Sequence, residues 1–189
     1  MLRSAGRPGD HGLMHRARRI VAIAACGIAL AACSSSTASS GKSGTDSGTG
    51  PTAASRALTT RTKAAGVELL DQESFETHIH TQLVVKVNGT TMEVPDEIGI
   101  DQDANRIAAL HTHDTDGLIH VESPVKNAKY TLDQFLILWG MPADADGRCT
   151  FFKAAAPCTL AVASKSLGPV GLDVTLVDED TLTLTVTST

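Results

Sequence analysis

Five of the seven histidines in this chain stand two residues apart from another histidine or from a glutamate. The five are His78, His80, His111, His113 and His120. Side chains two positions apart on a β-strand point to the same face, so each H-x-H pattern presents two imidazoles side by side. Neutral imidazole is a ligand for transition metals, and zinc and copper(II) both accept it together with carboxylate. The sequence therefore predicts a zinc or copper(II) site built from these histidines.

Two acidic residues accompany the histidines, Asp114 directly after His113 and Glu122 two positions after His120. We expect Asp114 and Glu122 to orient imidazoles by accepting their second N–H rather than to bind the metal. No catalytic residue is predicted, since no nucleophile motif accompanies the histidines. Two alternatives stay open. The histidines and acids could form a structural polar network in a non-catalytic binding module, or a metal-dependent enzyme could use Asp114 or Glu122 as its base.

The first histidine pair lies in a segment that alternates between apolar and polar side chains, residues 77–87. Such alternation predicts a half-buried strand, and it places His78 and His80 on the polar face. Asn88-Gly89 separates this segment from a second short alternating one at 90–94, a pattern that strongly favours a β-hairpin. The sequence therefore predicts that the first two imidazoles leave the face that packs the core.

The other three histidines lie in a second predicted hairpin, with strands at 107–113 and 118–122. A four-residue turn at 114–117 places His111 opposite His120, and all three imidazoles then share one face with Glu122. A three-residue turn with a bulge at Gly117 puts His120 and Glu122 on the face opposite His111. The sequence leaves both registers open.

The rest of the chain predicts a mainly β, α+β class: a small antiparallel domain built from hairpins, with one short buried helix near 132–139. Thr131 and Gln134 have capping-box spacing before an apolar run, and Gly140 follows it. Further strands are predicted at the following segments: 158–163, 172–177 and 181–186, the last two joined by an acidic turn. Residues 57–66 fit either a helix or a flexible segment.

The N-terminal region has the pattern of a bacterial lipoprotein signal peptide. A basic segment precedes an apolar run at 20–32, which is shorter than the roughly 20 residues that a membrane span needs. L-A-A-C closes the run, so residues 1–32 are predicted to be removed and Cys33 to be acylated. Residues 33–56 are rich in Ser, Gly and Thr and read as a flexible tether. We expect residues 57–189 to form a single globular domain, held by the lipid at the extracytoplasmic face of the cell membrane.

Charge and cysteine content restrict the partners and the compartment. The residues after Cys33 include 11 basic and 20 acidic side chains, a formal charge of −9, which argues against a nucleic-acid partner and leaves a protein of the cell envelope as a possible one. Cys149 and Cys158 are the only cysteines after Cys33. Outside the cytoplasm two such cysteines are expected to form a disulfide, and closing so short a loop stabilises by roughly 2–3 kcal/mol.

Several longer motifs together resemble a family of uncharacterised bacterial exported and lipoprotein domains. They are H-x-H at 78–80, V-N-G at 87–89, V-P-x-x-I-G-I-D at 94–101, L-H-T-H-D-T-x-G-x-I-H-V-E-S at 110–123, Y-T-L-x-Q-F at 130–135 and W-G at 139–140. The resemblance covers roughly residues 64 to 189, and L-H-T-H-D is its most specific part. It implies an exported domain without an established activity. Members often carry H-x-H-x-H at the first cluster, whereas Gln82 stands at the third position here.

Overall fold

The structure is a computed structural model that describes residues 53–189. The predicted signal peptide, Cys33 and the tether as far as residue 52 lie outside the described residues. The helices are α1 (Ala53–Ala65), α2 (Leu132–Trp139) and α3 (Ala145–Phe151). The strands are β1 (Leu69–Leu70), β2 (Thr77–Val87), β3 (Thr90–Met92), β4 (Ile100–Asp101), β5 (Arg106–Ala108), β6 (Leu110–His111), β7 (Leu118–Ser123), β8 (Cys158–Ser164), β9 (Gly168–Val170) and β10 (Thr181–Ser188). Within residues 53–189, no helix has both the length and the apolar character that a membrane crossing requires.

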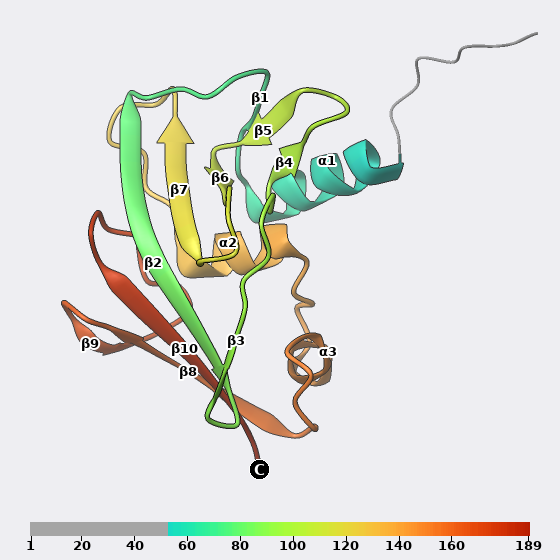
Figure 1. The fold of residues 1–189 in the computed structure, drawn as a ribbon, viewed down its shortest axis with the longest axis vertical. Coiled ribbons are helices and arrows are strands. Elements are labelled where there is room, and N and C mark those ends of the chain that lie inside the picture. Colours follow the sequence, from blue (N-terminus) through green and yellow to red (C-terminus); the bar gives the residue numbers. More distant parts are fainter. Residues whose placement is uncertain (1–52) are drawn as a thin grey trace, which may run out of the picture. The chain divides into compact units, whose positions relative to one another are not determined.

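The strands form two sheets (Figure 1). The larger sheet follows the order β6-β7-β2-β10-β8-β9, and β3 pairs with the C-terminal end of β2. The smaller sheet follows the order β1-β5-β4. Paired strands are antiparallel except β2 and β10, which run parallel. The predicted mainly β, α+β class is therefore confirmed, but the structure adds a parallel pair and two helices to the predicted hairpins and single helix.

The long strand β2 and its hairpin form as the alternation predicts. Asn88 and Gly89 both have positive φ, 49° and 83°, which suits the tight two-residue turn between β2 and β3. Leu83 and Val85 are buried, whereas His78 and Lys86 on the other face are exposed. The histidine pair therefore does leave the face of β2 that packs the core.

The core lies between the larger sheet and α2. Fully buried side chains of the sheet, Leu83, Leu182 and Leu184, belong to the same apolar cluster as Phe135 and Leu136 of α2. α2 begins with the predicted capping box and ends at Gly140, whose φ of 112° is the left-handed conformation that favours glycine.

Residues 57–66, which the sequence left open as helix or flexible segment, belong almost entirely to α1 (Ala53–Ala65). Ser55, Leu58, Thr62 and Ala65 are buried at helical spacing, so α1 has one face turned to the protein. Gln134 of α2 donates from Nε2 to the carbonyl of Ala65 at 2.9 Å, which ties the two helices together.

Two predicted strands do not form as expected. Residues 172–177 make only an isolated bridge, because their backbone pairs with the segment that leads into α2: Leu132 N donates to Val174 O and Leu176 N to Tyr130 O. The predicted strand 107–113 divides at Ala109 into β5 and β6, which belong to different sheets. Ala109 donates its N–H to Glu68 and accepts from the N–H of Glu122.

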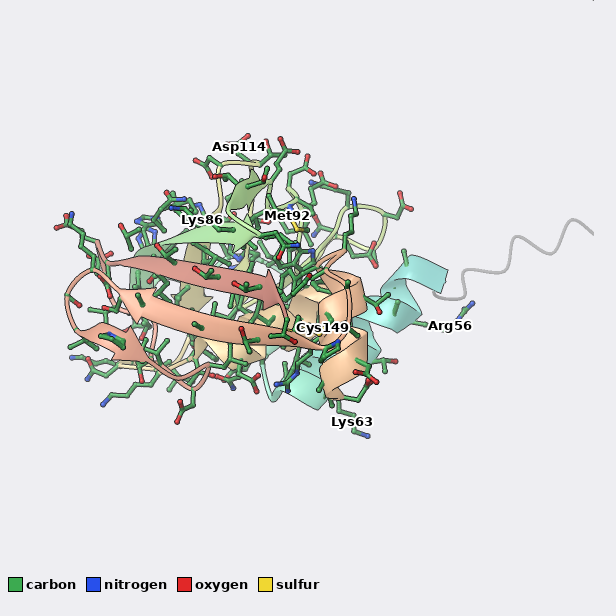
Figure 2. The ribbon with its side chains drawn as sticks, turned by 90° about the horizontal axis from the view of Figure 1, so that it is seen from below. Arg56, Lys63, Lys86, Met92, Asp114 and Cys149 are labelled. Carbon is green, nitrogen blue, oxygen red and sulfur yellow. A yellow bond between two sulfur atoms is a disulfide. The ribbon has the colours of Figure 1, made fainter. Side chains whose placement is uncertain are left out.

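Cys149 and Cys158, the predicted pair, form a disulfide bond. It joins α3 to the start of β8 (Figure 2, where Cys149 is labelled). The helix α3 that carries Cys149 was not predicted from the sequence. A signal was present, because Asp144 is the N-cap and accepts a hydrogen bond from Gly147 N at 2.6 Å.

Candidate metal centre

Three adjacent strands place one histidine each in a single row across the sheet. His80 on β2 lies opposite His120 on β7, and His120 lies opposite His111 on β6. Residues directly opposite in neighbouring strands project to the same face, and the ring centroids are 4.7 Å apart for His80 and His120 and 5.3 Å for His111 and His120. The pairing of His111 with His120 is the register of the four-residue turn at 114–117.

The other two histidines flank this row. His78 lies two residues before His80 and opposite Glu122, so both project to the same face as the row. His113 follows the short strand β6, and its ring centroid lies 4.7 Å from that of His120. All five predicted histidines therefore gather on one face at this end of the sheet.

The backbone around His80 is held by the segment that enters β10. His80 N donates to Asp178 Oδ1 at 2.9 Å, and Glu179 N donates to the carbonyl of His80 at 2.9 Å. These contacts fix the strand at the position where the imidazole leaves it. Asp178 was not predicted as a site residue, since it lies in the acidic turn that was predicted only as a connection between strands.

The donor atoms have the spacing of metal ligands. Nε2 of His78 lies 3.1 Å from Nε2 of His80, and Nε2 of His111 lies 3.1 Å from Nε2 of His113. Ligand atoms around a tetrahedral ion with bonds of about 2.0 Å are separated by about 3.3 Å. Three overlapping groups have all their ligand atoms within 4.8 Å of one another: His78 with His80 and His120, His111 with His113 and His120, and Glu73 with His111 and Glu122.

The tautomer of His111 follows from its hydrogen bond. Nδ1 lies 3.0 Å from the carbonyl of Ala108, which can only accept, so Nδ1 carries the hydrogen. In the neutral ring Nε2 then carries a lone pair and no hydrogen, and this lone pair is directed toward His113. A backbone carbonyl that fixes the outer nitrogen in this way is the usual support of a metal-binding histidine.

Burial keeps the central imidazoles neutral. His111 is fully buried, and burial lowers the pKa of His111 to about 3 against the opposing effect of its bond to Ala108. Burial also lowers the pKa of His120 to about 4, and the nearby His113 adds to this effect. Both rings are therefore unprotonated at neutral pH, which is the state that binds metal.

Glu122 lies within this cluster and is 4 % exposed. Its Oε1 lies 3.5 Å from His78 Nε2 and 3.6 Å from His120 Nδ1, and its Oε2 lies 3.9 Å from His111 Nε2. Burial, with the nearby Glu73, raises the pKa of the Glu122 carboxyl above its ordinary value. Glu122 was predicted to orient an imidazole, and its carboxylate also belongs to one of the groups whose atoms lie close enough together to hold a metal ion.

Two atoms at the centre of the cluster are buried without a hydrogen-bond partner among the described residues, Nδ1 of His120 and Oε2 of Glu122. Buried polar atoms are rarely left in this state, because desolvation without a partner costs about 1–3 kcal/mol. A cation between the nitrogen lone pairs and the carboxylate would satisfy both atoms.

One acidic member of the cluster, Glu73, was not predicted from the sequence. Glu73 lies in the connection from β1 to β2, and its Oε1 is 3.7 Å from His113 Nε2. The polar segment around Glu73 shows no periodicity or motif that could have indicated it. Only the path of the chain from one sheet to the other brings this carboxylate to the histidines.

Asp114 is placed differently from Glu122. It is exposed in the turn between β6 and β7, at the edge of the described domain (Figure 2). Within residues 53–189 no hydrogen bond or ion pair joins Asp114 to an imidazole, so its predicted orienting role has no geometric support. Gln82, at the third position of the first cluster, donates to the carbonyl of Asp116 at 2.7 Å and so braces the same turn.

A cavity of about 290 Å³ lies beside the histidine cluster. Glu73 and His113 line it together with Arg106, whose guanidinium is bound to Asp71 at 2.9 Å and to two backbone carbonyls. Small molecules can therefore reach the cluster at His113, whereas the side chain of His111 is fully buried.

Comparisons of the chain with protein-family models, with curated protein sequences and with solved structures gave no match.

Proposed function

We propose that this domain binds a divalent transition metal, zinc or copper(II), through its five clustered histidines. The observation that carries the proposal is the facing pair His111 and His113. Because His111 Nδ1 donates to Ala108, its Nε2 can only accept, and without a metal it accepts a hydrogen bond from His113 Nε2, 3.1 Å away. A metal ion that replaces this hydrogen would find both nitrogens at ligand spacing. The other donor contacts in the cluster, from 3.1 to 3.9 Å, repeat this spacing.

The donor set favours zinc or copper(II) over softer ions. Imidazole nitrogen and carboxylate oxygen suit both ions, whereas copper(I) selects thiolate and thioether ligands. The two cysteines of the described residues are joined in a disulfide and offer no thiolate.

We further propose that the protein is a lipoprotein at the extracytoplasmic face of the cell membrane, anchored through Cys33. L-A-A-C after a short apolar run supports this assignment. The disulfide between Cys149 and Cys158 also supports it, because such bonds persist in oxidising compartments.

Metal binding is tested on a full chain from which other ligands have been removed. The background chain carries His11→Ala, His15→Ala, Cys26→Ser and Cys33→Ser and is purified without a histidine tag. It should bind zinc and copper(II) in calorimetry at neutral pH. A background chain that binds neither ion would refute the proposal and leave a structural polar network as the role of the cluster.

Single variants of the background chain then locate the site. His111→Ala and His113→Ala should each weaken binding of the zinc ion that they ligate by more than the 10–100-fold typical of a residue that only supports a ligand. His120→Ala should have an equally large effect, because its ring lies between the two histidine pairs. Asp114→Asn is the matched control and should leave the affinity within about twofold of the background. Equal affinity for His111→Ala and Asp114→Asn would contradict the assignment.

Metal-dependent catalysis is a second candidate function, and one observation favours it. The cavity lined by Glu73 and His113 gives a metal ion at that end access to solvent. A catalytic metal keeps an exchangeable position, so azide added to the cobalt(II)-loaded background chain should change its visible spectrum. An unchanged spectrum at millimolar azide indicates a closed, non-catalytic ion.

A further inference from the structure

The seven donor side chains do not surround a single point. Two ligands of one ion cannot lie further apart than twice the bond length, about 4.1 Å. None of the groups found among the described residues with ligand atoms within 4.8 Å contains all five imidazoles. The histidines instead divide into one group with His78 and His80 and another with His111 and His113, and His120 belongs to both.

The two oxygens of Glu122 face different groups. Oε1 is directed toward His78 and His120, at 3.5 and 3.6 Å, whereas Oε2 is directed toward His111, at 3.9 Å. Glu122 reaches both groups because it lies opposite His78 on β2 and two residues after His120, whose other neighbour is β6. The carboxylate therefore spans the junction between the two groups.

A simple hydrogen-bonded role does not account for the second oxygen. Nε2 of His111 carries no hydrogen, because the hydrogen of the neutral ring is on Nδ1 and is donated to Ala108. Oε2 of Glu122 has no hydrogen-bond partner in residues 53–189, although it is buried. The two atoms are 3.9 Å apart with no hydrogen to share, and a buried carboxylate oxygen without a partner is stabilised by a positive charge beside it.

We propose that this cluster holds two divalent transition-metal ions, bridged by the carboxylate of Glu122. The first ion is bound by His78, His80 and His120, whose ligand atoms form one group, and by Glu122 Oε1, which lies 3.5 Å from His78 and 3.6 Å from His120. The second is bound by Glu73, His111 and Glu122 Oε2, which form another group, and by His113, whose Nε2 lies 3.1 Å from that of His111. Each set combines a group with one neighbouring donor, so its side chains must move closer together when the ion binds. Each ion then has four donors, the number that zinc prefers. The inference rests on the proposed metal binding and adds to it the number of ions, their separate ligands and the bridge.

The position of Glu73 supports the second ion in particular. Its carboxylate lies 3.7 Å from His113 and belongs to a ligand group with His111 and Glu122 that contains neither His78 nor His80. Two carboxylates offset part of the charge of two ions that are close together. A carboxylate-bridged pair has the short spacing, about 3.5–4 Å, of two-metal sites.

The number of ions is the first test, with zinc as the probe. The background chain, saturated with zinc and passed over a desalting column, should retain two zinc ions per chain by elemental analysis. One zinc per chain would overturn the two-ion centre while leaving the proposed metal binding intact. No retained zinc, together with no heat of binding, would instead remove the proposed function itself.

Variants at the two ends test whether the ions have separate ligands. His78→Ala and His113→Ala are matched, since both side chains are about two-fifths exposed and each belongs to one group only. Each variant should retain one zinc per chain at saturation, and the double variant should retain none. If either single variant still retains two zinc ions, the assignment of ligands is wrong.

Copper(II) tests the bridge independently of the count. The first equivalent should give the full electron paramagnetic resonance signal of an isolated ion, and the second should reduce the intensity per copper, because bridged ions couple magnetically. In Glu122→Gln, which is nearly isosteric and whose fold can be checked by circular dichroism, the intensity should rise in proportion to bound copper. A wild-type signal that doubles with the second equivalent would overturn the bridge.

Discussion

Acidification of the metal-free protein should destabilise it through the buried histidines. The pKa of His111 is about 3 and that of His120 about 4 in the folded state, against about 6.5 in the unfolded chain. Below pH 6.5 these two histidines therefore bind protons in the unfolded chain but stay unprotonated in the folded domain. Stability is fully present above pH 6.5 and is lost as the pH falls toward the folded pKa values.

The size of the effect follows from the same shifts. Each histidine contributes about 1.4 kcal/mol per pH unit over this range, so lowering the pH from 6.5 to 4.5 costs about 2–3 kcal/mol for each. Glu122 acts in the opposite direction, because its raised pKa lets the folded state take up a proton first. A net loss of about 3–5 kcal/mol is expected, a large part of the 5–15 kcal/mol that ordinarily stabilises a domain.

Urea unfolding of the background chain in EDTA, followed by circular dichroism between pH 7.5 and 4.5, measures this loss. His111→Gln is the matched control, because its amide can still donate to the carbonyl of Ala108 but does not titrate. The slope of its stability against pH should be smaller by about 1.4 kcal/mol per unit. Equal slopes in the two proteins, or a stability that does not change between pH 6.5 and 4.5, would refute the reasoning.

Three further substitutions probe the core, the disulfide and the anchor. Phe135→Ala removes a fully buried ring between α2 and the sheet and should lower the free energy of unfolding by about 3–5 kcal/mol in urea titrations; a loss below 1 kcal/mol would contradict the packing. Cys158→Ala should cost about 2–3 kcal/mol and leave zinc binding unchanged in calorimetry, since the disulfide contributes no ligand. Cys33→Ser in the otherwise native chain should release the protein from the membrane fraction; retention after a high-salt wash would count against the lipid anchor.

Local patterns in the sequence were enough to predict the elements that depend on neighbouring residues. The alternation along β2, the Asn88-Gly89 turn and the capping box of Thr131 and Gln134 each act over a few positions, and the structure contains all of them. The separate H-x-H patterns likewise indicated which imidazoles share a face. These features follow from the strand period of two and from backbone hydrogen bonding.

Features that depend on distant partners were not predictable. The turn at 114–117 permits two registers, and the one found is fixed by contacts outside it: Gly117 accepts from Leu83 N at 2.8 Å, and Gln82 donates to Asp116. Gly117 also lies so close to β2 that a Cβ there would meet the carbonyl of Leu83. Glu73 reaches the cluster only through the tertiary path of its loop. Residues 172–177 had the pattern of a strand but pair with the segment before α2.

The position of β10 has a consequence for when the domain can fold. β10 lies between β2 and β8, so it joins the two halves of the larger sheet. During synthesis residues 181–188 emerge after every other strand of residues 53–189, and until then β2 lacks its parallel partner and β8 its antiparallel one. Such long-range pairing delays folding until the chain through β10 is complete. Under the proposed export, such a chain can cross the membrane before it folds and bring its histidines together afterwards.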